Sequence, residues 1–162
     1  MAIREAMRTA IILMIMLFTA EAYPQDIRVR SVKRVIPDDN GSYLLSGVIP
    51  GTGQLLVAGS GYTGLMLLDT RKGSLQVITG DAGAGYEPAA TADGKKILYR
   101  SDTFTGNMKY SSVYSYDIET GSRELLVDKG RDVLPPAVSG NAVLLKSESG
   151  MKVEQAGPVL KS

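Results

Sequence analysis

The sequence has no cysteine and no histidine, so its candidate functional groups are mainly side-chain oxygens and tyrosine rings. The absence excludes a Ser-His-Asp triad, a thiolate nucleophile, a zinc site of the usual ligands and a c-type haem attachment within this chain. The formal net charge of +1 favours neither nucleic acid nor an acidic membrane surface as a partner. We therefore expect no catalytic residues and no cofactor in this chain.

One polar stretch has oxygen donors that suit a calcium ion. Its side chains, with one aspartate from an earlier loop, are Asp102, Thr103, Thr105, Asn107 and Asp81. Their spacing does not fit an EF-hand loop, which requires oxygen ligands at alternate positions and a distal glutamate. Asp, Asn, Thr and Gly are also the residues that build ordinary turns. We interpret residues 102–110 as a loop insertion and predict no metal site.

Two glycine-rich segments could be mistaken for functional loops. Residues 80–85 lack the Lys-Ser/Thr pair of a phosphate loop, and no helical pattern follows them. Residues 59–64 contain Ser60, but this serine is not in a strand-turn-helix context and is not a nucleophile. We expect a flexible connection at 80–85 and a hairpin loop at 59–64.

The segment from Tyr86 to Asp128 has the pattern of a complete four-stranded antiparallel sheet. Pro88 precedes a short first strand, and short apolar runs separated by Asp-Gly and Thr-Gly turns follow. The three further strands are expected at 96–101, 111–116 and 123–127. Four short strands joined by turns are typical of one blade of a β-propeller.

This segment resembles the repeat of the TolB-like propellers, also called PD40 or WD40-like. The family pattern is Ser-Pro-Asp-Gly-Lys before an apolar strand, and later an Asp followed by Thr-Gly. Ala92 stands in place of the usual proline, and Thr91 stands where serine is common. The matching residues are Asp93, Gly94, Lys95, Lys96, Ile97, Leu98 and Tyr99, then Asp117, Thr120 and Gly121.

Weaker copies of the same pattern precede and follow this unit. Leu55 to Val57 aligns with Ile97 to Tyr99, and residues 135–147 align with 88–101. The repeat is roughly 40 to 50 residues long, which is the length of a propeller blade. We predict an all-β propeller with one blade at 43–85, a PD40-like blade at 86–134 and a partial blade at 135–162. Because a propeller needs about four to eight blades, we expect the chain to be the N-terminal part of a longer protein; assembly of several copies into a ring is the other possibility.

The N-terminus has the pattern of an export signal. Arg4 and Arg8 precede the apolar run 10–20, and Ala20 and Ala22 are the small residues that a signal peptidase reads. We predict a signal peptide at 1–22, cleaved before Tyr23; the alternative is an uncleaved anchor, for which the run is short. Residues 23–42 are a lead-in whose segment 32–36 has the pattern of an outer strand that closes the ring.

Several aromatic residues of the central unit fall in or beside predicted loops, where propellers recognise ligands. We expect Tyr99, Tyr114 and Tyr116 to pack between blades. The candidate recognition residues are Tyr86, Glu87, Phe104, Met108 and Tyr110.

The resemblance implies an exported, non-enzymatic interaction platform in the periplasm or cell envelope of a Gram-negative bacterium. Its partner would be an envelope protein or a small ligand, without nucleic acid and without a membrane anchor after signal cleavage. Two alternatives stay open. Similar propellers gate the catalytic domain of prolyl-oligopeptidase-like serine peptidases, and others bind carbohydrate or peptide.

Overall fold

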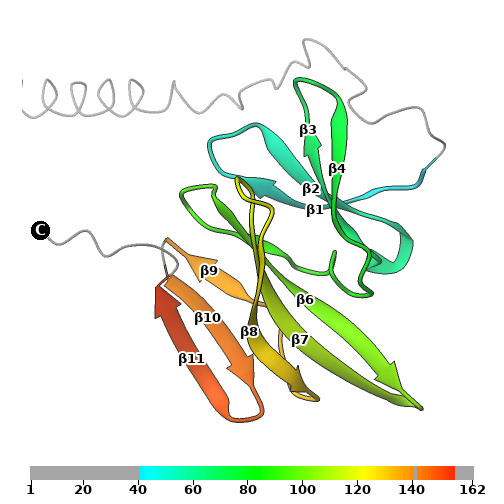
Figure 1. The fold of residues 1–162 in the computed structure, drawn as a ribbon, viewed down its shortest axis with the longest axis vertical. Coiled ribbons are helices and arrows are strands. Elements are labelled where there is room, and N and C mark those ends of the chain that lie inside the picture. Colours follow the sequence, from blue (N-terminus) through cyan, green and yellow to red (C-terminus); the bar gives the residue numbers. More distant parts are fainter. Residues whose placement is uncertain (1–40, 141, 156–162) are drawn as a thin grey trace, which may run out of the picture. The chain divides into compact units, whose positions relative to one another are not determined.

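Antiparallel strands make up nearly all of the regular structure in the computed structural model, which describes residues 41–140 and 142–155 (Figure 1). Within these residues the strands form three sheets, ordered β1-β2-β3-β4, β5-β6-β7-β8 and β11-β10-β9. A single 3-10 turn, η1 (Ser60–Tyr62), follows β2. The strands are β1 (Leu44–Ile49), β2 (Gln54–Ala58), β3 (Leu65–Asp69), β4 (Ser74–Thr79), β5 (Ala89–Ala90), β6 (Lys96–Thr105), β7 (Met108–Asp117), β8 (Arg123–Gly130), β9 (Ala137–Ser139), β10 (Ala142–Ser147) and β11 (Gly150–Gln155).

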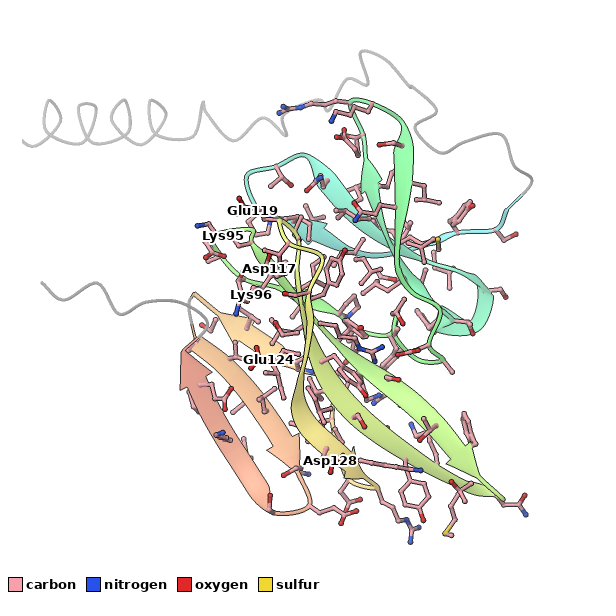
Figure 2. All side chains as sticks on the ribbon, viewed as in Figure 1. Lys95, Lys96, Asp117, Glu119, Glu124 and Asp128 are labelled. Atoms are coloured by element: carbon pink, nitrogen blue, oxygen red, sulfur yellow. The ribbon has the colours of Figure 1, made fainter. Side chains whose placement is uncertain are left out.

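The first two sheets repeat the same hairpin turn between their third and fourth strands. Oδ1 of Asp69 accepts the backbone N–H groups of Arg71 and Lys72 at 2.9 and 3.0 Å. Oδ1 of Asp117 accepts those of Glu119 and Thr120 at 3.1 and 2.8 Å. Figure 2 shows Asp117 and Glu119 at one end of β8 and Asp128 near the other. These hydrogen bonds lower the pKa of both aspartates, so the repeated acidic residue shapes a turn in each sheet.

The Asp-Gly-Lys motif that carries the family resemblance also builds a turn. The Thr91 hydroxyl donates to Oδ1 of Asp93 at 2.5 Å, and the Lys95 N–H donates to the same oxygen at 3.1 Å. Both bonds lower the pKa of Asp93. Gly94 has a φ of +69°, and a Cβ there would lie 2.9 Å from the carbonyl oxygen of Pro50. The motif therefore specifies how β5 reverses into β6, and it has a structural role.

Apolar side chains pack between consecutive sheets. The first and second sheets share a core that includes Leu56, Leu67, Ile97 and Tyr99. Tyr116 is also buried there and Tyr114 packs against it, so the predicted packing of these tyrosines between blades is confirmed. Burial raises the pKa of the Tyr99 phenol. The second and third sheets share another core, listed here by its buried members: Leu98, Val113, Val133, Val143 and Leu145.

The predicted loop insertion at 102–110 is wrong. β6 and β7, of ten residues each, continue through it as one hairpin, with Asp102 opposite Ser111 and Thr105 opposite Met108. Gly106, with a φ of +60°, and Asn107 form a two-residue turn between the strands. The polar composition suggested a loop, but Thr and Tyr favour strands. The end of the hairpin is polar because residues 103–109 are all exposed to solvent.

The two ends of the chain compare differently with the sequence predictions. The sequence did not indicate β11, which pairs with β10 at the edge of the third sheet in the described residues. The signal peptide at 1–22 and the ring-closing segment 32–36 lie outside the described residues. In the part of the chain that the structure describes, no helix has the length and apolar character needed to cross a bilayer.

Candidate functional site

Two glycine-rich loops, 59–64 and 80–85, pack against each other beside the second sheet. The Gly85 N–H donates to the Tyr62 carbonyl at 3.1 Å, and the Gly64 N–H donates to the Asp81 carbonyl at 2.9 Å. Ala84 is fully buried. A Cβ on Gly85 would lie 2.1 Å from Cβ of Ala58, so only glycine fits this close approach. The expected flexible connection at 80–85 is therefore a packed loop, because its small residues allow backbone to approach backbone.

This packing brings two tyrosines together at the surface. The rings of Tyr62 and Tyr86 meet edge to face, with centroids 5.3 Å apart. Their exposed fractions are 42% and 39%, so each ring rests on its neighbour and presents a face to solvent. The Arg100 guanidinium lies 5.4 Å from the centroid of the Tyr86 ring, in cation–π range.

The backbone beside this tyrosine pair is strained. Among the described residues, Tyr62 and Glu87 are the non-glycine residues with positive φ, at +58° and +51°. This conformation costs a bulky residue roughly 1 kcal/mol or more, and such residues concentrate at functional sites. The two tyrosines are therefore held in place at the expense of local backbone stability.

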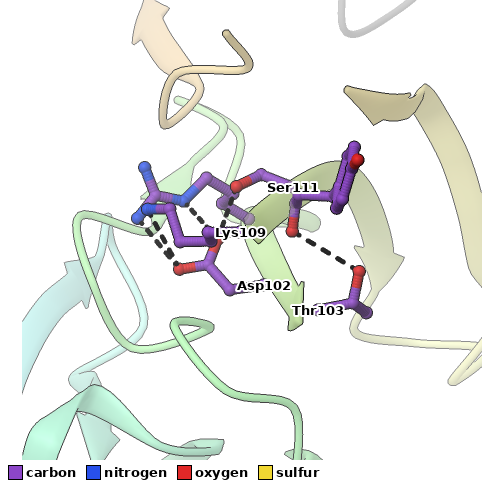
Figure 3. Close-up of polar contacts among 6 residues, drawn as sticks. Asp102, Thr103, Lys109 and Ser111 are labelled. Atoms are coloured by element: carbon purple, nitrogen blue, oxygen red, sulfur yellow. Dashed lines mark hydrogen bonds and ion pairs between the residues drawn. The ribbon is translucent and has the colours of Figure 1, made fainter. Parts of the chain in front are cut away.

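A charged network on β6 and β7 lies beside the tyrosine pair, and Figure 3 shows Lys109 and Ser111 next to Asp102 in this network. Nη2 of Arg100 donates to Oδ2 of Asp102 at 3.3 Å, and Nε lies 3.0 Å from Oδ1 without the alignment of a hydrogen bond. The Ser111 hydroxyl donates to Oδ1 at 2.6 Å, and Nζ of Lys109 lies 3.6 Å from Oδ2. The side chains of Arg100 and Asp102 are nearly buried, whereas that of Lys109 is 46% exposed. Asp102 thus fixes Arg100 beneath the Tyr86 ring.

A second aromatic group occupies the end of the β6–β7 hairpin. Phe104 is 65% exposed and Met108 is 46% exposed. The Tyr110 hydroxyl lies 3.8 Å from Sδ of Met108, and Nζ of Lys129 lies 4.8 Å from the Tyr110 ring centroid. A shallow hollow of about 660 Å³ adjoins this end of the hairpin and is lined by Asn107, Met108, Lys109, Arg131, Asp132 and Glu148.

The structure divides the five candidate recognition residues between these two groups. Tyr86 and Glu87 belong to the loop before β5, while Phe104, Met108 and Tyr110 lie on the strands of the hairpin. Sequence reasoning missed Tyr62 and Arg100. A tyrosine inside a glycine-rich loop was a usable signal for Tyr62, but its contact with Tyr86 depends on loop packing that no local pattern shows. We call Tyr62, Tyr86, Arg100, Asp102 and Lys109 the rim surface.

The acidic residues considered as calcium ligands have cationic partners instead. Oδ2 of Asp81 lies 2.8 Å from Nη2 of Arg123, and both oxygens of Asp102 contact cations. Thr103 and Thr105 contact Tyr110 and Lys129 through their hydroxyls. Within the described ranges, no group of three or more acidic side chains is placed so that it could hold a metal ion. The rim surface has aromatic faces and charged groups, which suit non-covalent binding through ring contacts and charge-assisted hydrogen bonds.

Comparison with known proteins shows the fold of the chain. Neither protein-family models nor curated proteins gave a match. Among solved structures, the chain is similar to TolB from Acinetobacter baumannii, with a TM-score of 0.50 and 19% sequence identity over 71% of this chain. The chain spans 32% of the length of that protein. Together with the antiparallel sheets, this likeness shows a TolB-like β-propeller architecture.

Proposed function

We propose that this chain is an exported, non-enzymatic propeller segment that binds a protein partner of the bacterial cell envelope through the rim surface. The TolB-like fold supports an envelope role, and the pattern of residues 1–22 supports export. The lack of cysteine and histidine supports binding in place of covalent catalysis. The proposal concerns this chain, whatever further segments a longer protein adds.

The observation that carries the proposal is the half-exposed tyrosine pair, in which Tyr62 has a strained backbone conformation. Tyr62 and Glu87 both lie in the left-handed region, and strained residues of this kind concentrate at functional sites. Tyrosine is a frequent anchor of protein interfaces, because its ring contributes contact area and its hydroxyl a hydrogen bond at a small entropic cost. Tyr86 is held between Tyr62 and Arg100, so little ordering remains to be done when a partner binds.

The charges of the rim surface suggest what the partner segment contains. The side chain of Lys109 is half exposed, and its contact with Asp102 is long, at 3.6 Å. The Lys109 ammonium group is therefore available to a second carboxylate. The tyrosine faces suit an apolar or planar side chain. We infer that the partner presents an apolar residue beside an acidic one, with the apolar residue on the tyrosines and the carboxylate on Lys109.

Affinity capture from envelope extracts tests this proposal when the wild type is compared with matched variants. Tyr62→Ala combined with Tyr86→Ala removes the aromatic surface and leaves the buried Arg100–Asp102 pair in place. Leu125→Ala is the control, because Leu125 is 49% exposed on β8 and outside the rim surface. We expect one envelope protein to be captured by the wild type and the control and lost with the double variant. Equal capture by all three proteins would rule out the rim surface as the binding site.

A further inference from the structure

A small cavity lies between the second and third sheets. It has a volume of about 220 Å³ and shares no residue with the rim surface. Part of its wall is apolar, because Leu98, Leu126 and Val143 line it and take part in the core between the two sheets. The rest of the wall carries polar and charged side chains. These polar side chains are Thr91, Lys96, Ser115, Glu124 and Glu154.

The pairing of the strands places three of these polar side chains on one face of the second sheet. Leu98, Ser115 and Glu124 lie opposite one another on β6, β7 and β8. Lys96 precedes Leu98 by two residues on β6, so its side chain points to the same face. Figure 2 shows Lys96 and Glu124 on the side of the second sheet that faces the third sheet. A cation and a carboxylate therefore flank the Ser115 hydroxyl.

The Ser115 hydroxyl is the group that points to a ligand. Ser115 is only 5% exposed and lines the cavity, and its hydroxyl has no hydrogen-bond partner among the described residues. The buried Thr91 hydroxyl, by contrast, donates to Asp93 and accepts the Lys96 N–H. Leaving a buried hydroxyl without a partner is costly. The cavity therefore favours a bound molecule that supplies the missing hydrogen bond.

The two charged side chains beside Ser115 are also free to bind. Neither Lys96 nor Glu124 forms an ion pair with another described residue. The pKa of Asp117, which lies opposite Lys96, is lowered chiefly by the hydrogen bonds of its turn and least by the charge of Lys96. On the third sheet, Glu154 already pairs with Lys152. One positive and one negative charge thus remain for a ligand.

We propose that this cavity binds a free α-amino acid with an apolar side chain, such as leucine. The ammonium group of the ligand binds Glu124, its carboxylate binds Lys96 and the Ser115 hydroxyl, and its side chain contacts the apolar wall. A zwitterion matches both charges, whereas a simple cation or anion leaves one of them unpaired. The cavity is smaller than the roughly 300–1,000 Å³ of sites for drug-sized ligands, which limits the ligand to about this size.

Isothermal titration calorimetry with three related ligands tests the proposal. Leucine carries both charges, leucinamide carries only the ammonium group, and isocaproate carries only the carboxylate. We expect the wild type to bind leucine at least about tenfold more tightly than either analogue, because each analogue lacks one charge-assisted contact. No binding of leucine, or similar affinity for leucine and one analogue, overturns the proposal.

Matched variants assign the two charges. Lys96→Met should weaken leucine binding by about tenfold and leave leucinamide binding unchanged, whereas Glu124→Gln should weaken the binding of both. Lys95→Met and Glu119→Gln are the controls, because these exposed neighbours do not line the cavity. Figure 2 labels all four residues. If Lys96→Met and Glu124→Gln bind leucine as tightly as the controls do, the ligand lies elsewhere and the proposal is wrong.

Discussion

At the scale of single residues, the strained backbone at Glu87 directly follows Tyr86, a member of the rim surface that we propose for binding. Glu87 is an exposed residue with a φ of +51°. Glycine adopts this conformation without strain. We expect Glu87→Gly to raise the free energy of unfolding by up to about 1 kcal/mol, measured by urea denaturation.

The matched control for this substitution is Glu124→Gly in the regular strand β8. A glycine in a strand interior costs about 0.5–1 kcal/mol, so this variant should be less stable than the wild type. Equal destabilisation by both substitutions would show that Glu87 is not strained.

The Arg100–Asp102 pair allows a second prediction at this scale. Both side chains are nearly buried, so Asp102→Asn leaves the guanidinium without its counter-charge. Removing one partner of a buried pair is strongly destabilising, and we expect a loss of about 3 kcal/mol in the free energy of unfolding.

Lys109 provides the comparison, because it contacts the same carboxylate from a side chain that is 46% exposed. Solvent screens such a pair, so Lys109→Ala should change stability by less than about 1 kcal/mol. If the two variants lost the same amount of stability, Asp102 would have no special role in holding Arg100.

At the scale of elements, the packed loop 80–85 rests on its close contact with β2. A Cβ added at Gly85 meets Ala58, whereas nothing lies within 4 Å of a Cβ added at Gly80. We expect Gly85→Ala to cost about 1–3 kcal/mol by overpacking and Gly80→Ala to cost little, as measured by urea denaturation. A neutral Gly85→Ala variant would mean that the two glycine-rich loops do not pack as described.

The Asp-containing turns make stability depend on acid pH. Hydrogen bonds from backbone N–H groups and from the Thr91 hydroxyl lower the pKa of Asp69, Asp93 and Asp117 below the ordinary value of 3.8. Their unfolded-state pKa values are higher, so this contribution to stability is present above pH 3.8 and is lost as the pH falls through the lower folded values. We expect the melting temperature to fall in that acid range.

The substitution Asp117→Asn isolates one of these turns. An asparagine oxygen still accepts the two N–H groups but does not titrate, so the acid-dependent loss should shrink. A variant whose melting temperature has the same pH profile as the wild type would contradict the role assigned to the Asp117 carboxylate.

Turn chemistry explains why the strands were predictable from the sequence and the surface contacts were not. Asp93-Gly94 and Asp117 to Gly121 place turn residues between apolar runs, and the structure has a turn at each. At 102–110 the same polar residue types led to the wrong prediction of a loop. In the structure, Asp102 and Ser111 lie opposite each other in the β6–β7 strand pair. Local composition does not distinguish the two cases.

At the scale of the molecule, the repeat of the sheets was visible in the sequence, and the rim surface was visible only in part. The alignment of residues 55–57 with 97–99 corresponds to β2 and β6, the second strands of two sheets. Tyr62 lies in the turn between β2 and β3, whereas Arg100 lies on β6 of the second sheet. A backbone contact from Gly85 positions Tyr62. Such a contact depends on how the sheets pack, which a single sequence does not specify.

The measurement that tests the central claim most directly is photo-crosslinking in intact cells, with a crosslinking amino acid at position 62 or position 125. The two positions are similarly exposed, at 42% and 49%, but only the first lies on the rim surface. We expect a crosslink from position 62 to one envelope protein, and its loss when Tyr86 is changed to alanine. A crosslink from both positions to the same proteins, or none from position 62, would contradict the account.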